Sequence, residues 1–332
     1  MSALITNSRA KLARLCARRH DLQYRQGYRP TGEAEELAFG TLIHECLAAW
    51  WVKAEPGFEL ELRLAAAQSV LDAATLDPFV RMKAQVMITG YHARWCNEPL
   101  YVVAVEKEFA GPLRNPDTGA ASQVWQLAGK LDVVARDAAG DLWLIEHKTS
   151  NEDLTPGGTY HRRLRMDSQV SIYFDGAEVL GHKVRGCIYD VLAKPAQRPL
   201  KATPMESRKF KADGKLYANQ RDADEVPEAY CARLVEAVSA KPDEFFARIE
   251  VPRLETELDD ARRDLWQQAQ RIREDERLQR APRNPEACNA YGRICSFFEV
   301  CTGAASLDDP RLFTKVTNVH PELGEVTRAA QG

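Results

Sequence analysis

The 332-residue sequence predicts an α/β fold. Segments with the β-branched or alternating character of strands occupy the middle of the chain, in the order strand, strand, strand, helix, strand. Segments whose apolar residues recur at helical spacing precede and follow them. Strands enclosed by helices in this way generally form a sheet that the helices cover. We therefore expect one sheet between helical layers.

The chain before the strands is predicted to be helical. The first 25 residues are interpreted as a basic helix that carries Cys16. Residues 40–52, GTLIHECLAAWWV, place apolar side chains at helical spacing, and amphipathic helices are expected within residues 58–98.

The strand-rich region shows four segments with strand character, which are residues 100–109, 124–136, 141–149 and 184–193. A turn at residues 137–140, Asp-Ala-Ala-Gly, joins the second strand to the third. Residues 165–181 are predicted to form the helix before the fourth strand.

The last third of the chain is less regular. Residues 195–225 are polar and contain proline, so they form either a substrate-contacting loop or an ordinary surface excursion. Residues 253–280 carry an apolar stripe that predicts a long helix packed on the core. Residues 303–332 are expected to be a loosely held tail, which leaves one domain over residues 1–302.

Composition excludes a membrane protein and is ordinary for a globular one, with 45% hydrophobic and 28% charged residues. No apolar run approaches the roughly 20 residues that span a bilayer, and the N-terminus lacks the pattern of a secretory signal. We expect a cytoplasmic location, or the host cytoplasm for a viral protein. The net charge is −3, but residues 1–30 and 194–215 are each locally basic. These stretches either follow a phosphate backbone or are ordinary surface charge.

Two acids and a lysine are the candidate catalytic group. Asp132 lies in GKLD on the second predicted strand, and Glu146 and Lys148 lie in EHK on the third. A short hairpin would bring Asp132 beside Glu146, and residues two apart on a strand leave the same face. Two carboxylates that bind Mg²⁺ or Mn²⁺ next to an ammonium group suit metal-assisted hydrolysis of a phosphodiester. The alternative is an ordinary salt bridge at a strand edge.

The GKLD and EHK motifs resemble the active-site signature of the PD-(D/E)xK nuclease superfamily. The resemblance implies a restriction-endonuclease-like core, a mixed sheet flanked by helices, with helical insertions. It implies a Mg²⁺- or Mn²⁺-dependent phosphodiesterase in which Asp132, Glu146 and Lys148 are catalytic.

Two further motifs resemble the RecB-like branch of that superfamily, Gly40-x-x-x-His44 and Gln169-x-x-x-Tyr173. The resemblance implies that Gln169 and Tyr173 contact the substrate or the catalytic lysine. It implies these metal ligands: His44, Asp132, Glu146 and the backbone carbonyl of His147.

Glu106 and Glu108 share a face of the first predicted strand, and either is a further acidic ligand or faces DNA. We favour Glu106. Tyr173 and Trp125 are aromatic candidates for stacking on bases.

Eight cysteines occur, and four of them, Cys46, Cys96, Cys187 and Cys231, are interpreted as packing residues. Cys288, Cys295 and Cys301 are closely spaced, and Cys16 is the best candidate for a fourth ligand. This arrangement resembles the iron–sulfur staple of AddB-type nucleases, in which a [4Fe–4S] cluster joins the two ends of the domain. Four thiolates also suit structural zinc, and three unligated thiols are the remaining alternative.

The predicted function is a metal-dependent DNA nuclease, an exonuclease acting on DNA ends or single strands in recombination, repair or phage DNA metabolism. The sequence contains no G-x-x-x-x-G-K-[ST] phosphate-binding loop, so a helicase partner would be a separate protein. The alternatives are a non-catalytic DNA-binding or assembly factor that keeps the nuclease fold, and a zinc-stapled structural protein.

Overall fold

A computed structural model describes residues 3–32, 35–52, 60–290 and 292–324. Its centre is a mixed sheet in which β4 (Ala121–Arg136) pairs with three other strands. It runs parallel to β1 (Ala3–Ile5) and antiparallel to β3 (Tyr101–Arg114) and β5 (Leu142–Ser150). β5 then pairs in parallel with β6 (Gly186–Ala193), and β6 pairs antiparallel with β7 (Phe246–Val251).

The four predicted strands correspond to β3, β4, β5 and β6, and the predicted α/β class is confirmed. β1 and β7 were not predicted. Every residue of β6, GCIYDVLA, is buried, as expected for a central strand covered on both faces.

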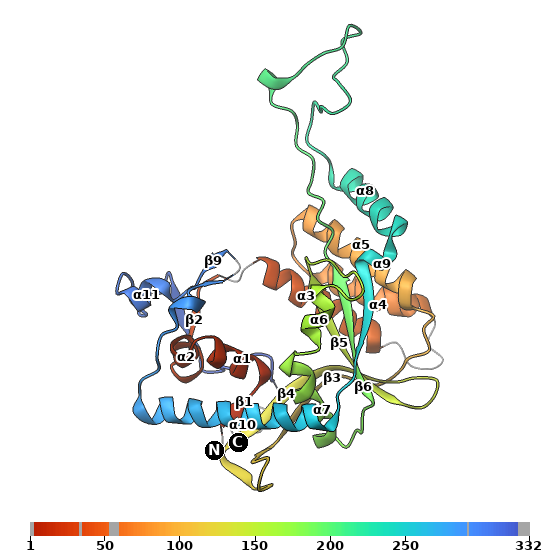
Figure 1. Ribbon diagram of the computed structural model, residues 1–332. Helices are drawn as coiled ribbons and strands as arrows, with labels where there is room; N and C mark the ends of the chain where they lie inside the picture. The colour runs from red at the N-terminus through yellow and green to blue at the C-terminus, as the bar shows by residue number, and fades with distance from the viewer. Residues whose placement is uncertain (1–2, 33–34, 53–59, 291, 325–332) are drawn as a thin grey trace.

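Helices cover both faces of the sheet (Figure 1). On one face lie α3 (Glu35–Val52), α4 (Leu60–Ala73), α5 (Pro78–Trp95) and α8 (Pro227–Ala240), and their apolar side chains form one core with Val133, Ile145 and Ile188. On the other face lie α1 (Asn7–Leu15), α7 (Ser168–Val179) and α10 (Glu255–Leu278), which pack with Val134, Leu144 and Tyr189. Neighbouring strand residues thus enter opposite cores, as the two-residue period of a strand requires.

Short elements complete the fold. α6 (Thr159–Leu164) precedes α7, and α9 (Pro242–Phe245) precedes β7. The last part of the chain contains η3 (Pro285–Ala287), β8 (Asn289–Ala290), β9 (Arg293–Ile294) and α11 (Phe298–Thr302). Within the described ranges, no helix is long and apolar enough to cross a membrane.

The two ends of the chain differ from the prediction. Instead of one basic helix, α1 is followed by a break at Cys16, then by α2 (Ala17–His20) and the π-helical turn η1 (Asp21–Arg25). Cys16 has extended backbone angles, φ −159° and ψ 110°, which no helical residue adopts.

The C-terminal segment is not loosely held as far as it is described. β10 (Phe313–Lys315) pairs antiparallel with β2 (Tyr28–Pro30). Phe313 is buried with Leu22 and Phe297, and Leu323 is buried with Leu4 and Ala128. Apolar burial against the N-terminal region fixes this segment, and residues 325–332 lie outside the described part.

Residues 195–225, predicted to be irregular, form a long arm that projects from the body of the molecule between β6 and α8 (Figure 1, green). Its regular structure consists of one short 3-10 turn, η2 (Met205–Ser207), and one isolated bridge between Phe210 and Leu216.

Candidate active site

Asp132, Glu146 and Lys148 lie together at the junction of β4 and β5. Val133 pairs with Ile145 across the two strands, which places the next residues, Asp132 and Glu146, side by side. The backbone N–H of His147 donates to Asp132 Oδ2 at 2.9 Å, and Lys148 Nζ donates to Glu146 Oε1 at 2.5 Å. Both carboxylates are buried, with Asp132 8% and Glu146 2% exposed. Two acids and an ammonium group therefore converge in a largely dry site.

Burial raises the pKa values of the two acids. Burial, reinforced by the charge of Asp132, raises the pKa of Glu146 to about 7. Burial raises the pKa of Asp132 to about 6, although the charge of Lys148 opposes this. For Lys148, burial lowers the pKa, but the charges of Glu146 and Asp132 outweigh burial and raise it. Lys148 is therefore protonated. A bound cation would favour the ionised form of the two acids.

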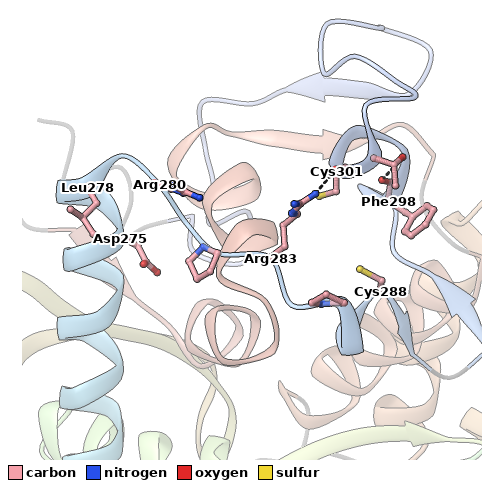
Figure 2. A pocket seen from close by; sticks show the side chains of 10 residues that line it. Asp275, Leu278, Arg280, Arg283, Cys288, Phe298 and Cys301 are labelled. Carbon is pink, nitrogen blue, oxygen red and sulfur yellow. Dashed lines mark hydrogen bonds between the residues drawn. The ribbon is translucent and has the colours of Figure 1, made fainter.

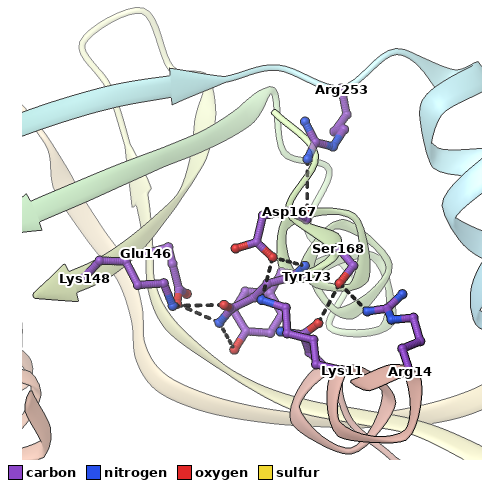
Figure 3. Close-up of polar contacts among 10 residues, drawn as sticks. Lys11, Arg14, Glu146, Lys148, Asp167, Ser168, Tyr173 and Arg253 are labelled. Atoms are coloured by element: carbon purple, nitrogen blue, oxygen red, sulfur yellow. Dashed lines mark hydrogen bonds and ion pairs between the residues drawn. The ribbon is translucent and has the colours of Figure 1, made fainter. Parts of the chain in front are cut away.

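Gln169 and Tyr173 extend this network from α7 (Figure 3). Gln169 Oε1 accepts from Lys148 Nζ at 2.9 Å, and its Nε2 donates to Glu146 Oε1 at 2.7 Å and to the Tyr173 hydroxyl at 2.9 Å. The side chain of Asp167 caps α7 by accepting from the backbone N–H of Gln169. The i, i+4 spacing of Gln169 and Tyr173 puts them on one helical face, and that face holds Lys148 in place.

The donor atoms at this site fit a divalent cation. Glu146 Oε2 is buried without a hydrogen-bond partner, and a buried carboxylate oxygen in that state is stabilised by a metal ion. His44 Nδ1 lies 3.6 Å from Asp132 Oδ2, and burial lowers the pKa of His44, which favours the neutral imidazole that binds metals. As the described side chains stand, no three His, Cys, Asp or Glu groups converge closely enough to form a preset site for one ion.

Of the two candidate glutamates on β3, Glu106 lies nearer the site. It forms an ion pair with Lys130, and its charge raises the pKa of Asp132 after the larger effects of burial and Lys148. Its φ of 50° is unusual for a residue other than glycine, so its backbone is strained. Glu108 instead accepts from the backbone N–H of Gly324 in the C-terminal segment.

Comparison with known proteins identifies the family. Residues 5–302 match the family model of the PD-(D/E)XK nuclease superfamily. The chain belongs to this superfamily. Its members are typically phosphodiesterases that use Mg²⁺ or Mn²⁺, and the expected fold, a mixed sheet flanked by helices, is confirmed.

Other similarities are weak. No curated protein matches the sequence. Among solved structures, the crystal structure of SSO0001 is similar over 80% of this chain and 85% of that chain, with 17% identity and a TM-score of 0.29. We draw nothing from a likeness at that level.

A buried network behind the PD-(D/E)XK site was missed by sequence reasoning. Asp190 on β6 is fully buried and pairs in register with His147. It accepts from the Tyr91 hydroxyl at 2.6 Å and from Arg248 Nη2 at 3.1 Å. Burial raises the pKa of Asp190 to about 7, against the effect of the Tyr91 hydrogen bond. Asp190 Oδ2 also lies 3.7 Å from His147 Nδ1, so the network contacts β5 between Glu146 and Lys148. The sequence feature that could have indicated this network is the single acidic residue, Asp190, within the apolar run CIYDVLA.

Helix α1 borders the site from the other side (Figure 3). Lys11 Nζ donates to Asp167 Oδ1 at 2.8 Å, and Arg14 Nη2 donates to Ser168 Oγ at 2.8 Å. Part of the first basic stretch therefore lies beside the N-terminus of α7, two residues from Gln169. Trp125 was a candidate for stacking on bases, but it is fully buried beneath Arg9, whose guanidinium carbon is 4.7 Å from its ring. That prediction is wrong.

Tyr173, the other stacking candidate, is half-buried and packs edge-on against Phe109, with ring centroids 6.2 Å apart. Its hydroxyl faces Gln169. In this arrangement Tyr173 supports the lysine network.

The four cysteines of the predicted staple lie in one region. The backbone N–H of Cys295 donates to the carbonyl of Cys288 at 2.8 Å. Burial raises the pKa of Cys301, and the charges of Cys16, Cys295 and Cys288 raise it further while Arg18 lowers it. Among the described residues, no three of these cysteines come close enough together to hold a metal ion as they stand.

Hydrogen bonds tie the segment of Cys16 to the segment of the other three. Asn284 Nδ2 donates to the carbonyl of Leu15 at 2.8 Å, and the backbone N–H of Arg18 donates to the carbonyl of Pro282 at 2.9 Å. Cys288 and Cys301 line a pocket of about 770 Å³ together with Arg280 and Arg283 (Figure 2). Of the other cysteines, Cys46 and Cys187 are buried and Cys96 and Cys231 are half-buried, each as a free thiol.

Proposed function

We propose that this protein is a Mg²⁺- or Mn²⁺-dependent deoxyribonuclease whose site contains Asp132, Glu146 and Lys148. The observation that carries the proposal is the geometry around Glu146. One of its oxygens contacts Lys148 and Gln169, and the other is buried without a partner. A carboxylate with one oxygen left over, beside a second acid and a cation, suits a metal-assisted hydrolytic site.

Each side chain has a distinct part in the proposed reaction. His44, Asp132, Glu146 and the backbone carbonyl of His147 would hold the metal ion. When bound, the ion polarises a phosphoryl oxygen and lowers the pKa of a coordinated water.

Lys148 is the proposed electrostatic group. Because its pKa is raised, it stays protonated, orients the attacking water and counters the charge that develops on the phosphate. Gln169, held by Tyr173, fixes the direction in which the ammonium group points.

The proposed substrate is DNA with an end or a single-stranded region, degraded exonucleolytically in recombination, repair or phage DNA metabolism. Lys11 and Arg14 support this because they place positive charge next to the helix that carries Gln169. The strained Glu106 is proposed to face the substrate or the metal. A helicase or recombination protein would act as a separate partner.

We also propose that Cys16, Cys288, Cys295 and Cys301 bind a [4Fe–4S] cluster, with zinc as the alternative. The support is the pair of hydrogen bonds that join the segment of Cys16 to the segment of the other three cysteines. Thiolates around four irons stand further apart than thiolates around one ion, so the cluster does not require a tight group of sulfur atoms. Its proposed role is to hold the two ends of the nuclease domain together.

The decisive experiment incubates the purified protein with linear single-stranded DNA, linear duplex and closed circular duplex, in Mg²⁺, in Mn²⁺ and in EDTA. We expect degradation of the linear substrates with either metal, no cleavage in EDTA and little cutting of closed circles. Rapid cutting of closed circles would replace the exonuclease proposal with an endonuclease. Metal-independent binding without cleavage of any substrate would favour the non-catalytic alternative.

A further inference from the structure

The arm of residues 195–225 starts beside the candidate site. β5 and β6 are parallel, with Lys148 opposite Val191 and Ser150 opposite Ala193. The arm leaves directly after Ala193, where the backbone N–H of Lys194 donates to the carbonyl of Ser150 at 2.7 Å. The end of the sheet that carries Lys148 is therefore the end from which the arm projects.

The arm is an ordered structure. Its base is fixed to α8, because Arg233 forms an ion pair with Glu225 at 2.8 Å and the Tyr230 hydroxyl donates to the carbonyl of Gln197 at 2.9 Å. Cross-strand bonds hold its length, including the backbone N–H of Thr203 to the carbonyl of Arg221 at 2.9 Å. Prolines at 195, 199 and 204 favour an extended, semi-rigid limb. A limb of residues 194–204 reaches at most roughly 40 Å, about a dozen nucleotides of a stacked strand.

The tip of the arm is a turn closed by one isolated antiparallel bridge and two flanking pairs, and it has two unlike faces. Phe210 and Leu216 form an antiparallel bridge, so their side chains share one face. The flanking pairs join Lys211 to Lys215 and Tyr217 to Lys209 through backbone hydrogen bonds. Because side chains alternate along a strand, Lys209, Lys211, Lys215 and Tyr217 share the opposite face. We call this set the lysine face.

The lysine face lacks partners that would explain it within the protein. All four of its side chains are exposed, and Tyr217 is 49% exposed. Throughout the described segments, none of its three lysines forms an ion pair with a carboxylate. Lys211 and Lys215 stand directly opposite one another, and like charges opposite each other destabilise a hairpin. Asp213 in the turn uses its carboxylate to accept from the backbone N–H of Lys215.

We infer that the lysine face is a second nucleic-acid contact, which binds a single-stranded segment of DNA away from the hydrolytic site. Three exposed ammonium groups supply the positive charge that a phosphate backbone attracts, and an exposed tyrosine on the same face offers a platform for a base. The inference rests on the proposed function for its choice of DNA. The arm thereby holds the strand at one point while the site acts at another.

The test measures binding of a fluorescein-labelled single strand of about 40 nucleotides in EDTA, across a salt series. Reversing Lys209, Lys211 and Lys215 to Glu should weaken binding at least about tenfold and lower the slope of log K against log salt by about 2. Tyr217→Ala should weaken binding about fivefold or more. Phe210→Ala, the matched aromatic control on the other face, should change it little.

The matched charge control reverses Arg136, Lys183 and Arg185, which lie at the opposite end of the sheet, to Glu and should bind nearly like the parent. Equal losses in both triple variants would overturn the inference, since they would reflect overall charge alone. Unchanged binding by the lysine-face triple and by Tyr217→Ala would also overturn it and assign the tip to protein contacts.

Cleavage separates this inference from the proposed function. A strand of about 6 nucleotides is too short to reach the tip, so the lysine-face triple should cleave it at the parent rate. If the parent cleaves no DNA but the tip variants bind the long strand weakly, the arm contact stands and the proposed catalysis fails. If the parent cleaves DNA and the tip variants bind normally, the catalysis stands and the arm contact fails.

Discussion

The candidate site on β4 and β5 and the region around the four cysteines obtain their order in different ways. Asp132, Glu146 and Lys148 lie on long strands that pair on both sides. Glu146 and Lys148 form hydrogen bonds with each other and with Gln169. The cysteines stand on breaks and short turns, such as α2 with 4 residues and α11 with 5. Elements that short are not stable alone.

This difference indicates where each region depends on a ligand. At the candidate site, strand pairing fixes the backbone, so the fold does not depend on the proposed metal ion. Around the cysteines the elements are short, so a bridging ligand would contribute to stability directly.

The largest effect is expected from removing a charged side chain at the candidate site. Asp132→Ala and Lys148→Ala should each lower the cleavage rate at least about a hundredfold, because each removes a group that stabilises charge in the transition state. Single-turnover assays on end-labelled DNA measure this, and circular dichroism should show an unchanged fold. Lys183→Ala, exposed at the far end of β6, is the matched control. Near-normal cleavage by Lys148→Ala would remove Lys148 from the mechanism.

The cysteine region should show the reverse pattern, with stability changing first. Anaerobically purified protein is expected to absorb visible light and to contain about four irons per chain. Cys16→Ala or Cys301→Ala should remove the absorbance and lower Tm, whereas the half-buried Cys231 can be replaced by Ala without either effect. Colourless protein with one tightly held zinc would keep the staple and reject the cluster.

Sequence patterns were sufficient where order is local. The four central strands were predicted because each carries a run of at least eight residues of strand character, and β1 was missed because it has 3 residues. Asp132 and Glu146 could be placed together because a tight turn leaves two strands little choice of pairing.

Features that depend on distant contacts could not be predicted. Trp125 was a candidate for stacking on bases, but it is buried in the core that contains Ile5, and Arg9 covers its ring. The break at Cys16 and the packing of residues 313–324 depend on partners nearly 300 positions away, such as β2 for β10. Asp190 was overlooked because its partners, Tyr91 and Arg248, come from α5 and β7.

A smaller effect, on stability, is expected in the buried network of Asp190 behind the candidate site. Asp190→Ala removes one of the two carboxylates that pair with the buried Arg248 and leaves Glu98 as the other, and losing a buried hydrogen bond to a charged group costs up to about 3 kcal/mol of unfolding free energy. The matched control is Asp175→Ala, which breaks the more exposed pair with Arg262 and should cost about 1 kcal/mol. Denaturant unfolding of both variants decides this. Equal losses would show that burial of the Asp190 pair has no special role.

The smallest predicted effect is a pH dependence at the N-terminal end of the cysteine region. Burial, with a further contribution from the charge of Arg9, lowers the pKa of His20 from 6.5 to about 3, while Asp21 opposes and His320 adds to the shift. His20 Nε2 accepts from Arg9 Nε at 3.1 Å and stacks on Tyr24. The folded protein therefore holds this imidazole neutral, whereas the unfolded chain takes up a proton below pH 6.5.

Because the unfolded state binds the extra proton, the contribution of His20 to stability is complete above pH 6.5 and is lost as the pH falls towards 3. Between pH 7 and pH 5 the loss amounts to about 2 kcal/mol. His20→Gln keeps an acceptor for Arg9 but cannot titrate. The raised pKa values of Asp132, Glu146 and Asp190 act in the opposite direction in both proteins, so the difference between parent and variant isolates His20. We expect the variant to lose about 2 kcal/mol less than the parent between these two pH values in denaturant unfolding. Parallel losses would show that His20 does not titrate in this range and that the N-terminal region is insensitive to acid.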